Sequence, residues 1–367
     1  MSSAVKRSLA AAALFGVAAL IGGCDSSGKP VAAAAAPVTA PAPGSPPADR
    51  EMPEFPAGAT WINSAPLTRE ALRGKVVVVD FWTYSCINCL RATPYINAWY
   101  ARYRDSGLVI IGVHSPEFGF EKDAANVRMA IQKFHIEYPV VLDNDFAIWK
   151  AYDNRFWPAH YFIDAEGRIR GHHYGEGKYA ESEHTIRALL TEAGVANLPP
   201  PVDAAAGEGV TAAADVANIE SPETYLGFAR GENFTSPGSF EPDAVKDYQL
   251  PAQIALNEWA LAGRWLVSRE KAQLQAAPGR IKFRFKARDL HLVLGPGPKG
   301  EPVRFRVLLD GKPPGADHGM DIDASGAGVV REQRLYQLIR QQGGVQEHDF
   351  TIEFLDPHVE AFSFTFG

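Results

Sequence analysis

The chain has 367 residues, of which 46% are hydrophobic, 22% charged and 11% aromatic, and its formal net charge at pH 7 is -7. This composition excludes disorder throughout the chain, and the length predicts two domains because single cores stop growing near about 250 residues. The chain lacks the basic surplus typical of nucleic-acid binding, so no nucleic-acid partner is expected. Three cysteines are too few for a disulfide scaffold, and an odd number leaves at least one outside any pair.

Residues 1–24 have the features of a secretion signal. Lys6 and Arg7 give a positive start, and an apolar stretch over residues 9–21 leads to Ile-Gly-Gly followed by Cys24. The apolar stretch is short for a membrane-spanning helix, and small residues precede the cysteine. This segment resembles the lipobox of bacterial lipoproteins, which implies lipidation of Cys24 and a membrane anchor. A plain signal peptide with a chance cysteine is the alternative.

A tether is expected between this signal and the first domain. Residues 25–52 are rich in Ala, Pro, Ser and Gly and have no apolar period, which is typical of an extended linker. Asp25 directly follows the cysteine, and in enterobacterial lipoproteins this residue implies retention in the inner membrane. The expected location is therefore the bacterial cell envelope, on the periplasmic side of the inner membrane.

Residues 53–197 alternate apolar, β-branched runs with helical patterns. The runs predict strands over residues 76–81, 108–113, 138–142, 160–163 and 168–174, and the patterns between them predict helices over residues 88–103, 124–134 and 182–193. Strands that alternate with helices predict an α/β domain.

A C-x-x-C pair follows the first of these strands. Cys86 and Cys89 stand where the strand gives way to a helix, which is typical of a redox dithiol. Cys86 at the helix N-terminus is the expected nucleophile, because free amides and the helix dipole stabilise a thiolate there. Cys89, one turn later, is the expected resolving thiol. No cofactor is expected beyond this redox-active disulfide.

Other kinds of site fit the cysteine pair less well. A zinc site would need a second ligand pair, and haem attachment would need histidine where Leu90 stands. A peroxiredoxin would have proline at the position of Val79, although Thr83 fits that motif. A structural disulfide remains an alternative, but a loop this short stabilises little through chain entropy.

The segment around the cysteines resembles thioredoxin. The residues that carry the likeness are Val79 to Trp82 ahead of the pair, Pro94 behind it, and Trp157-Pro158, the position of the family's cis-proline. The longer runs over residues 82–91, 113–118 and 157–164 are similar to the extracytoplasmic thioredoxin-like region of the DipZ family, and the likeness extends over residues 53–367. DipZ proteins also carry a membrane-embedded CcdA-like electron-transfer module; no such module is expected here, and the lipid is expected to serve as the anchor in its place.

The resemblance implies roles for several residues. Asp80 matches the buried thioredoxin carboxylate that assists deprotonation of the resolving cysteine, although a solvated strand-end residue is the alternative. Glu117 resembles the active-site glutamate of the ResA/TlpA-like branch, with an ordinary loop acid as the alternative. The residues expected to surround the sulfurs are Trp82, Tyr84, Asn88, Trp157 and Pro158, with core packing as the alternative for Trp82.

The C-terminal region has a different period. After a Pro/Ala/Gly-rich linker over residues 198–220, apolar residues alternate with polar ones around residues 281–286, 303–307, 350–354 and 362–366. This alternation predicts an all-β jelly roll or sandwich over residues 221–367. The corresponding DipZ region resembles carbohydrate-binding modules in fold, so glycan is a possible partner. The aromatic side chains that could stack on sugar are Trp259, Trp265, Tyr225 and Tyr336, with core packing as the alternative.

One segment of this region matches the spacing of a calcium loop. The matching residues are Asp321, Asp323, Ser325 and Glu332. Gly328 occupies the usual apolar position and strands are expected on both sides, so a polar hairpin turn is favoured over a metal site.

These features together predict a lipid-anchored thiol–disulfide oxidoreductase. Its expected substrates are disulfide-containing envelope proteins, and a CcdA-like membrane protein is its expected electron donor. Reduction of the substrate is favoured because the DipZ family resembles reductive pathways linked to CcdA and to cytochrome c biogenesis. The alternatives are a disulfide-forming oxidase, a glycan- or partner-binding protein with an accessory redox domain, and a peroxidase, which Val79 disfavours.

Overall fold

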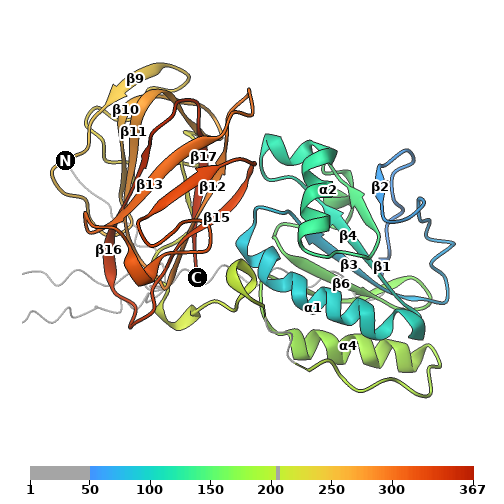
Figure 1. Ribbon diagram of the computed structural model, residues 1–367. Coiled ribbons are helices and arrows are strands. Elements are labelled where there is room, and N and C mark those ends of the chain that lie inside the picture. Colours follow the sequence, from blue (N-terminus) through green and yellow to red (C-terminus); the bar gives the residue numbers. More distant parts are fainter. Residues whose placement is uncertain (1–49, 204–206) are drawn as a thin grey trace, which may run out of the picture. The chain divides into compact units, whose positions relative to one another are not determined.

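The computed structural model describes residues 50–203 and 207–367. The expected signal, Cys24 and nearly all of the expected tether lie outside the described residues. Within the described ranges, no helix has the length and apolar character needed to cross a membrane. Residues 45–367 form one compact unit, in which an α/β part precedes an all-β part (Figure 1).

The α/β part is built on a mixed sheet with the strand order β1-β7-β6-β3-β4-β5-β2. In chain order the strands are β1 (Arg50–Glu51), β2 (Trp61–Ile62), β3 (Val76–Trp82), β4 (Leu108–His114), β5 (Val140–Leu142), β6 (Ala159–Ile163) and β7 (Arg168–Tyr174). The central strand β3 runs parallel to β4 and antiparallel to β6, and all seven of its residues are buried. Its continuous apolar run therefore reflects burial on both faces.

Helices pack on both faces of this sheet. They are α1 (Ile87–Tyr103), α2 (Ala124–Lys133), α3 (Ala147–Ala151) and α4 (Tyr179–Glu192), with the short 3-10 turns η1 (Arg104–Ser106) and η2 (Gly119–Lys122). Val76 and Val78 share a core cluster with α1, α2 and α4. Val77 and Val79, which point the other way, share a second cluster with α3 and the segment before β3. The fold is thioredoxin-like.

Four details depart from the sequence analysis. Arg50 and Glu51, assigned there to the tether, pair with β7 as an edge strand. The strands β1 and β2 and the five-residue helix α3 were not predicted, because elements this short carry too few residues to display a period. Tyr138 lies before β5 rather than in it.

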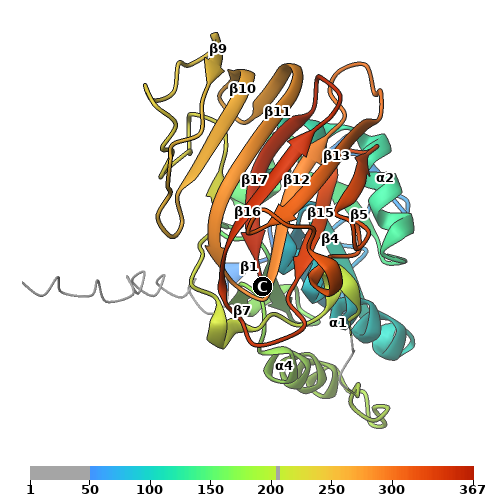
Figure 2. The ribbon, with the colours of Figure 1, turned by 60° about the vertical axis from the view of Figure 1, so that its left-hand side comes forward.

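The all-β part contains ten antiparallel strands. They are β8 (Thr224–Tyr225), β9 (Val245–Tyr248), β10 (Trp259–Val267), β11 (Ala272–Lys286), β12 (Asp289–Gly295), β13 (Val303–Leu309), β14 (Ala327–Val330), β15 (Arg334–Arg340), β16 (Glu347–Phe354) and β17 (Glu360–Phe366). The long strand β11 joins two layers: most of its length pairs with β10 and β16, and its first residues pair with β17 (Figure 2).

The two layers face each other across an apolar core. The ring of Phe283 on β11 lies 4.9 Å from that of Phe364 on β17, although these residues are not strand partners. Phe350 on β16 also contacts Phe364, with 5.8 Å between ring centroids. This arrangement is the predicted sandwich.

Three of the four aromatic side chains considered for sugar stacking are core residues. Trp259, Trp265 and Tyr336 are buried within the sandwich cluster. Tyr225 is half-buried, and the guanidinium of Arg230 lies over its ring at 3.4 Å. Core packing, the alternative given above for these rings, therefore holds for Trp259, Trp265 and Tyr336, while glycan binding by this region stays a prediction.

The segment between the two parts is not a bare linker. It contains the short turns η3 (Gly209–Thr211) and η4 (Val216–Asn218), and a further turn, η5 (Gly315–Asp317), lies inside the sandwich. Val210 packs against an apolar cluster shared by both parts, and Arg340 donates to the carbonyl of Gly209 at 3.1 Å. The sandwich is thus held against the α/β part on the side of α1.

Candidate active site

Cys86 and Cys89 lie at the start of α1, immediately after the loop that leaves β3. Cys86 is the N-cap residue, and its Sγ accepts a hydrogen bond from the Cys89 amide at 3.3 Å. Both cysteines are free thiols; Cys86 is half-buried, whereas Cys89 is only 2% exposed. Cys86 is therefore the thiol that a substrate can reach, and it lies where helix amides favour an anion.

The Cys89 thiol resists ionisation. Burial raises the pKa of Cys89 well above its ordinary value, and the neighbouring Cys86 and the charge of Asp80 raise it further. A thiol of this kind needs a nearby base before it can act as a nucleophile.

Asp80 lies within reach of that thiol on β3. It is 4% exposed and is paired in register with His160 on β6. Its Oδ1 lies 3.3 Å from His160 Nε2, and among the described residues neither ring nitrogen of His160 has a hydrogen-bond partner. Asp80 is thus a buried carboxylate rather than a solvated strand-end residue. No redox role was expected for His160, because the sequence shows it only as a polar residue within an apolar strand.

Trp157 and Pro158 directly precede β6. The peptide bond between them is cis, as the resemblance to thioredoxin implies, and Pro158 is buried. The Trp157 indole donates to the carbonyl of Ser115 at 3.1 Å, and Trp157 lines the same cavity as Cys86.

The other predicted neighbours of the sulfurs differ in exposure. Trp82 is 2% exposed and belongs to the same apolar cluster as Cys89, so it is a core residue. Tyr84 is buried and stacks on His114 with 5.7 Å between ring centroids, and burial raises the pKa of its phenol. Asn88 is exposed and lines the cavity at Cys86.

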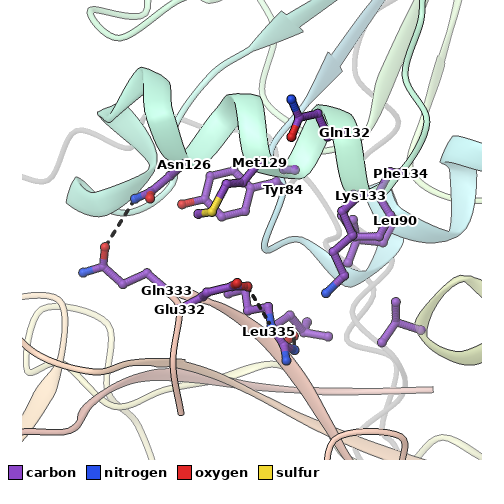
Figure 3. Close-up of a pocket in the computed structure, with 13 residues that line it drawn as sticks. Tyr84, Leu90, Asn126, Met129, Gln132, Lys133, Phe134, Glu332, Gln333 and Leu335 are labelled. Carbon is purple, nitrogen blue, oxygen red and sulfur yellow. Dashed lines mark hydrogen bonds and ion pairs between the residues drawn. The ribbon is translucent and has the colours of Figure 1, made fainter. Parts of the chain in front are cut away.

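Tyr84 also borders a second cavity of about 400 Å³. This cavity lies between α2 and the start of β15, where Asn126 donates to Gln333 at 3.3 Å (Figure 3). Met129 forms part of its lining and is 43% exposed. The cavity does not include either cysteine.

Glu117 lies at the cavity beside Cys86, but its carboxylate faces the sandwich. Its Oε1 accepts from the Tyr225 hydroxyl at 2.6 Å and from Arg230 at 2.8 Å. The Glu117 carboxylate is therefore paired with two sandwich side chains. It does not have the setting of an acid that is free to act on the sulfurs.

Glu121 is the buried acid that sequence reasoning missed. It is fully buried, and its Oε1 accepts from the Ser85 hydroxyl at 2.6 Å and from the Ser85 amide at 3.3 Å. Its Oε2 accepts from the amides of Glu117 and Phe118 at 2.5 Å and 2.9 Å. Burial raises the pKa of Glu121 to about 7, against the lowering effect of these donors. Glu121 thereby ties the residue before Cys86 to the loop after β4.

The segment considered as a calcium loop binds its own protein groups. Asp321 pairs with Arg334 at 2.7 Å, and Asp323 accepts from Ser325. Glu332 lies 3.5 Å from Arg334 (Figure 3). Within residues 50–203 and 207–367, no group of three or more histidine, cysteine or acidic side chains is placed to hold a metal ion.

Comparisons with known proteins decide the family. Residues 47–172 match the AhpC/TSA family, and residues 221–367 match the family described as "Thioredoxin like C-terminal domain". The thiol-disulfide oxidoreductase YkuV of Bacillus subtilis is 30% identical over 142 residues, which cover 95% of YkuV and 38% of this chain. The chain belongs to the thioredoxin-like thiol–disulfide oxidoreductases.

The likeness to DipZ extends further along the chain. DipZ of Mycobacterium bovis is 41% identical over 259 residues, which make up 69% of this oxidoreductase but only 35% of DipZ. A solution structure of a thioredoxin-like protein in the oxidised form is 30% identical and covers 39% of this chain and 97% of its own, with a TM-score of 0.37. The predicted DipZ relationship is confirmed.

Proposed function

We propose that this oxidoreductase is a lipid-anchored protein of the bacterial envelope that reduces protein disulfides through Cys86 and Cys89. The observation that carries the proposal is the unequal burial of the two thiols. Cys86 is half-buried at a helix N-terminus and opens onto a cavity, while Cys89 is buried beside Asp80. An accessible nucleophile and a shielded resolving thiol suit disulfide exchange.

The exchange proceeds in two balanced steps. The Cys86 thiolate attacks one sulfur of the substrate disulfide; this S–S bond breaks, a mixed disulfide forms and the first substrate thiolate leaves. Cys89 then loses its proton to Asp80 and attacks Cys86 Sγ, which releases the second substrate thiolate and closes the Cys86–Cys89 disulfide. Two electrons pass to the substrate, and its two thiolates take up protons.

Asp80 is suited to accept the Cys89 proton. The charge of Asp80 raises the pKa of Cys89. Asp80 is therefore close enough to the Cys89 thiol to interact with it. His160 Nε2 lies 3.3 Å from Oδ1, but no hydrogen bond joins the two groups in the described structure.

The reductive direction is proposed from the similarity to DipZ, because the DipZ family resembles reductive pathways linked to CcdA. A CcdA-like membrane protein is the proposed electron donor, and disulfide-containing envelope proteins are the proposed substrates. The reverse flow of electrons would make the protein an oxidase.

Peroxide reduction is the second candidate, because residues 47–172 match the AhpC/TSA family. Thr83 fits the peroxiredoxin pattern, and its hydroxyl lies 3.4 Å from His114 Nε2. Val79 stands where that pattern has proline. Hydrogen peroxide consumption by the reduced protein distinguishes this reaction from disulfide exchange.

The test of exchange is a trapping experiment in the envelope. Cys89→Ser removes the resolving thiol, so mixed disulfides between Cys86 and substrate proteins should accumulate and disappear on reduction. Cys86→Ser is the matched control and should trap nothing. Absence of trapped species in the Cys89→Ser protein would contradict the proposal. A redox titration of the pair then tests direction, and a potential near that of strong oxidants would contradict the reductive reading.

The anchor is tested separately. Labelling of the cells with a clickable fatty acid should mark the protein, and Cys24→Ser should abolish the label. A labelled Cys24→Ser protein, or an unlabelled parent protein, would contradict lipidation at this residue.

A further inference from the structure

The sandwich covers one side of the dithiol. Ile87 and Leu90, which flank Cys89 in the first turn of α1, are buried in a cluster with Phe118 and with sandwich residues. The sandwich residues of this cluster are Val293, Leu335 and Phe362. The ring of Phe362 lies 4.7 Å from that of Phe120 and 5.2 Å from that of Phe118. A folded partner cannot dock on this side without displacing the sandwich.

Cys86 remains open to a cavity of about 450 Å³ that both parts of the chain line. From the α/β part come Asn88, Glu117 and Trp157, and from the sandwich come Tyr225, Arg230 and Phe366. The sandwich therefore forms a wall of the active-site cavity.

This wall is fixed to the α/β part by polar contacts. Tyr225 and Arg230 both donate to the Glu117 carboxylate, and the Arg230 guanidinium lies over the Tyr225 ring. Glu270 of the sandwich accepts from the Gly119 amide at 3.1 Å. Tyr225 itself belongs to β8, which pairs with β17. The cavity is thus bounded by groups with defined partners.

The size of the opening limits what can reach Cys86. Clefts of about 300–1,000 Å³ accommodate small ligands, and an extended chain advances about 3.3 Å per residue. The cavity therefore accommodates a disulfide with a few flanking residues of an extended segment. A specific interface with a folded protein needs about 800 Å² of surface on each partner, and the sandwich already covers part of the surface around the dithiol.

We propose that the sandwich is a substrate-selecting wall, which admits disulfides carried on extended or unfolded polypeptide segments and excludes those on the surfaces of folded proteins. The inference rests on the proposed exchange at Cys86 and leaves its chemistry unchanged. The cavity is lined by charged side chains of both signs, Arg155 and Arg230 with Glu117 and Glu223, so the proposed selection is by shape.

The experiment uses the full reduced chain and two probes that carry the same disulfide. One is a folded reporter protein with a single surface disulfide, and the other is a linear peptide pair of the reporter's sequence around that disulfide. The wild-type kcat/KM for the peptide should exceed that for the folded reporter by about a hundredfold, a ratio within reach of a shaped site. Equal values would overturn the proposal.

The double variant Tyr225→Ala/Arg230→Ala removes the side chains of the wall. We expect it to lower the peptide-to-reporter ratio about tenfold, mainly through faster reduction of the reporter. Tyr225→Phe keeps the ring and should keep the ratio, and Arg304→Ala, on an exposed arginine that does not line the cavity, is the matched control. An unchanged ratio in the double variant would overturn the proposal.

Two further results keep the test decisive. Arg230 is 51% exposed in its side chain, so Arg230→Ala alone tests the wall with little risk to folding, and it should shift the ratio in the same direction. If Arg230→Ala also leaves the peptide-to-reporter ratio of kcat/KM unchanged, the proposal that the sandwich selects substrates is wrong. Failure of the wild-type protein to reduce either probe would instead overturn the proposed exchange, and with it the selection that depends on it.

Discussion

The two cores of this chain bury ionisable groups in different settings. The α/β core encloses Asp80, Glu121 and His160 in the domain that carries the dithiol. The sandwich also buries Asp289 and Glu360, outside its central apolar cluster. In the first core burial changes the chemistry of side chains, as the raised pKa values of Cys89 and Glu121 indicate. In the second, burial stabilises a shape that bounds the active-site cavity.

The largest effect is expected from the apolar core. Phe283→Ala removes a fully buried ring that contacts Phe364 and Phe366, so the free energy of unfolding of the sandwich should fall by about 3–5 kcal/mol. Urea denaturation followed by tryptophan fluorescence measures the loss. Below the unfolding transition, the reaction of Cys86 with a small aromatic disulfide should be unchanged. A slower reaction in the folded variant would show that the two cores are not separate in function.

A pH-dependent effect is expected from Glu121. Burial raises its pKa to about 7, whereas a glutamate in the unfolded chain titrates near about 4.3. Folding therefore binds a proton between these values, and this group's contribution to stability falls as pH rises through that window, by on the order of 3 kcal/mol. Glu121→Gln should flatten the pH dependence of the free energy of unfolding between pH 5 and pH 8.

The control for this measurement is an exposed acid of the same domain. Glu137 is 73% exposed in its side chain, and Glu137→Gln should leave the pH dependence as it is in the wild type. An identical slope in the Glu121→Gln protein would contradict the assignment of a raised pKa to this carboxylate.

A kinetic effect of slightly smaller size is expected from Asp80. Loss of a positioned proton acceptor in Asp80→Asn should slow resolution of the mixed disulfide about a hundredfold, equivalent to about 2.7 kcal/mol of activation free energy. Single-turnover release of substrate thiol measures this step, while the preceding attack by Cys86 should change little. Equal slowing of both steps would indicate a general loss of structure instead.

The sequence predicted the regular parts of the fold because their patterns are local. The buried run at β3, the alternating residues of β11 and β16, and the boundaries of α1 each follow from a period or a cap within one segment. Cys86 and Cys89 were recognised in the same way, from their spacing and their place after a strand. The short elements β1, β2 and α3 were missed because pairing and packing stabilise them more than any pattern of their own.

The residues whose setting the sequence left open depend on contacts that no local pattern displays. Glu117 and Glu121 are four residues apart in one loop, and nothing in their spacing distinguishes the acid paired with Tyr225 and Arg230 from the acid buried against Ser85. The sequence around Trp259 likewise does not show whether its ring packs in the core or stacks on sugar, and the structure shows that it is buried.

The sequence by itself determined the two fold classes, the redox pair and the relationship to DipZ, because each is carried by residues that are neighbours in the chain. Only the tertiary structure decided which carboxylate is buried and that the sandwich covers one side of α1. The burial of Glu121 depends on its desolvation and on donors from other loops, such as Ser85. The place of the sandwich depends on contacts between segments more than a hundred residues apart, such as Tyr225 with Glu117. No local pattern in the sequence displays either kind of contact.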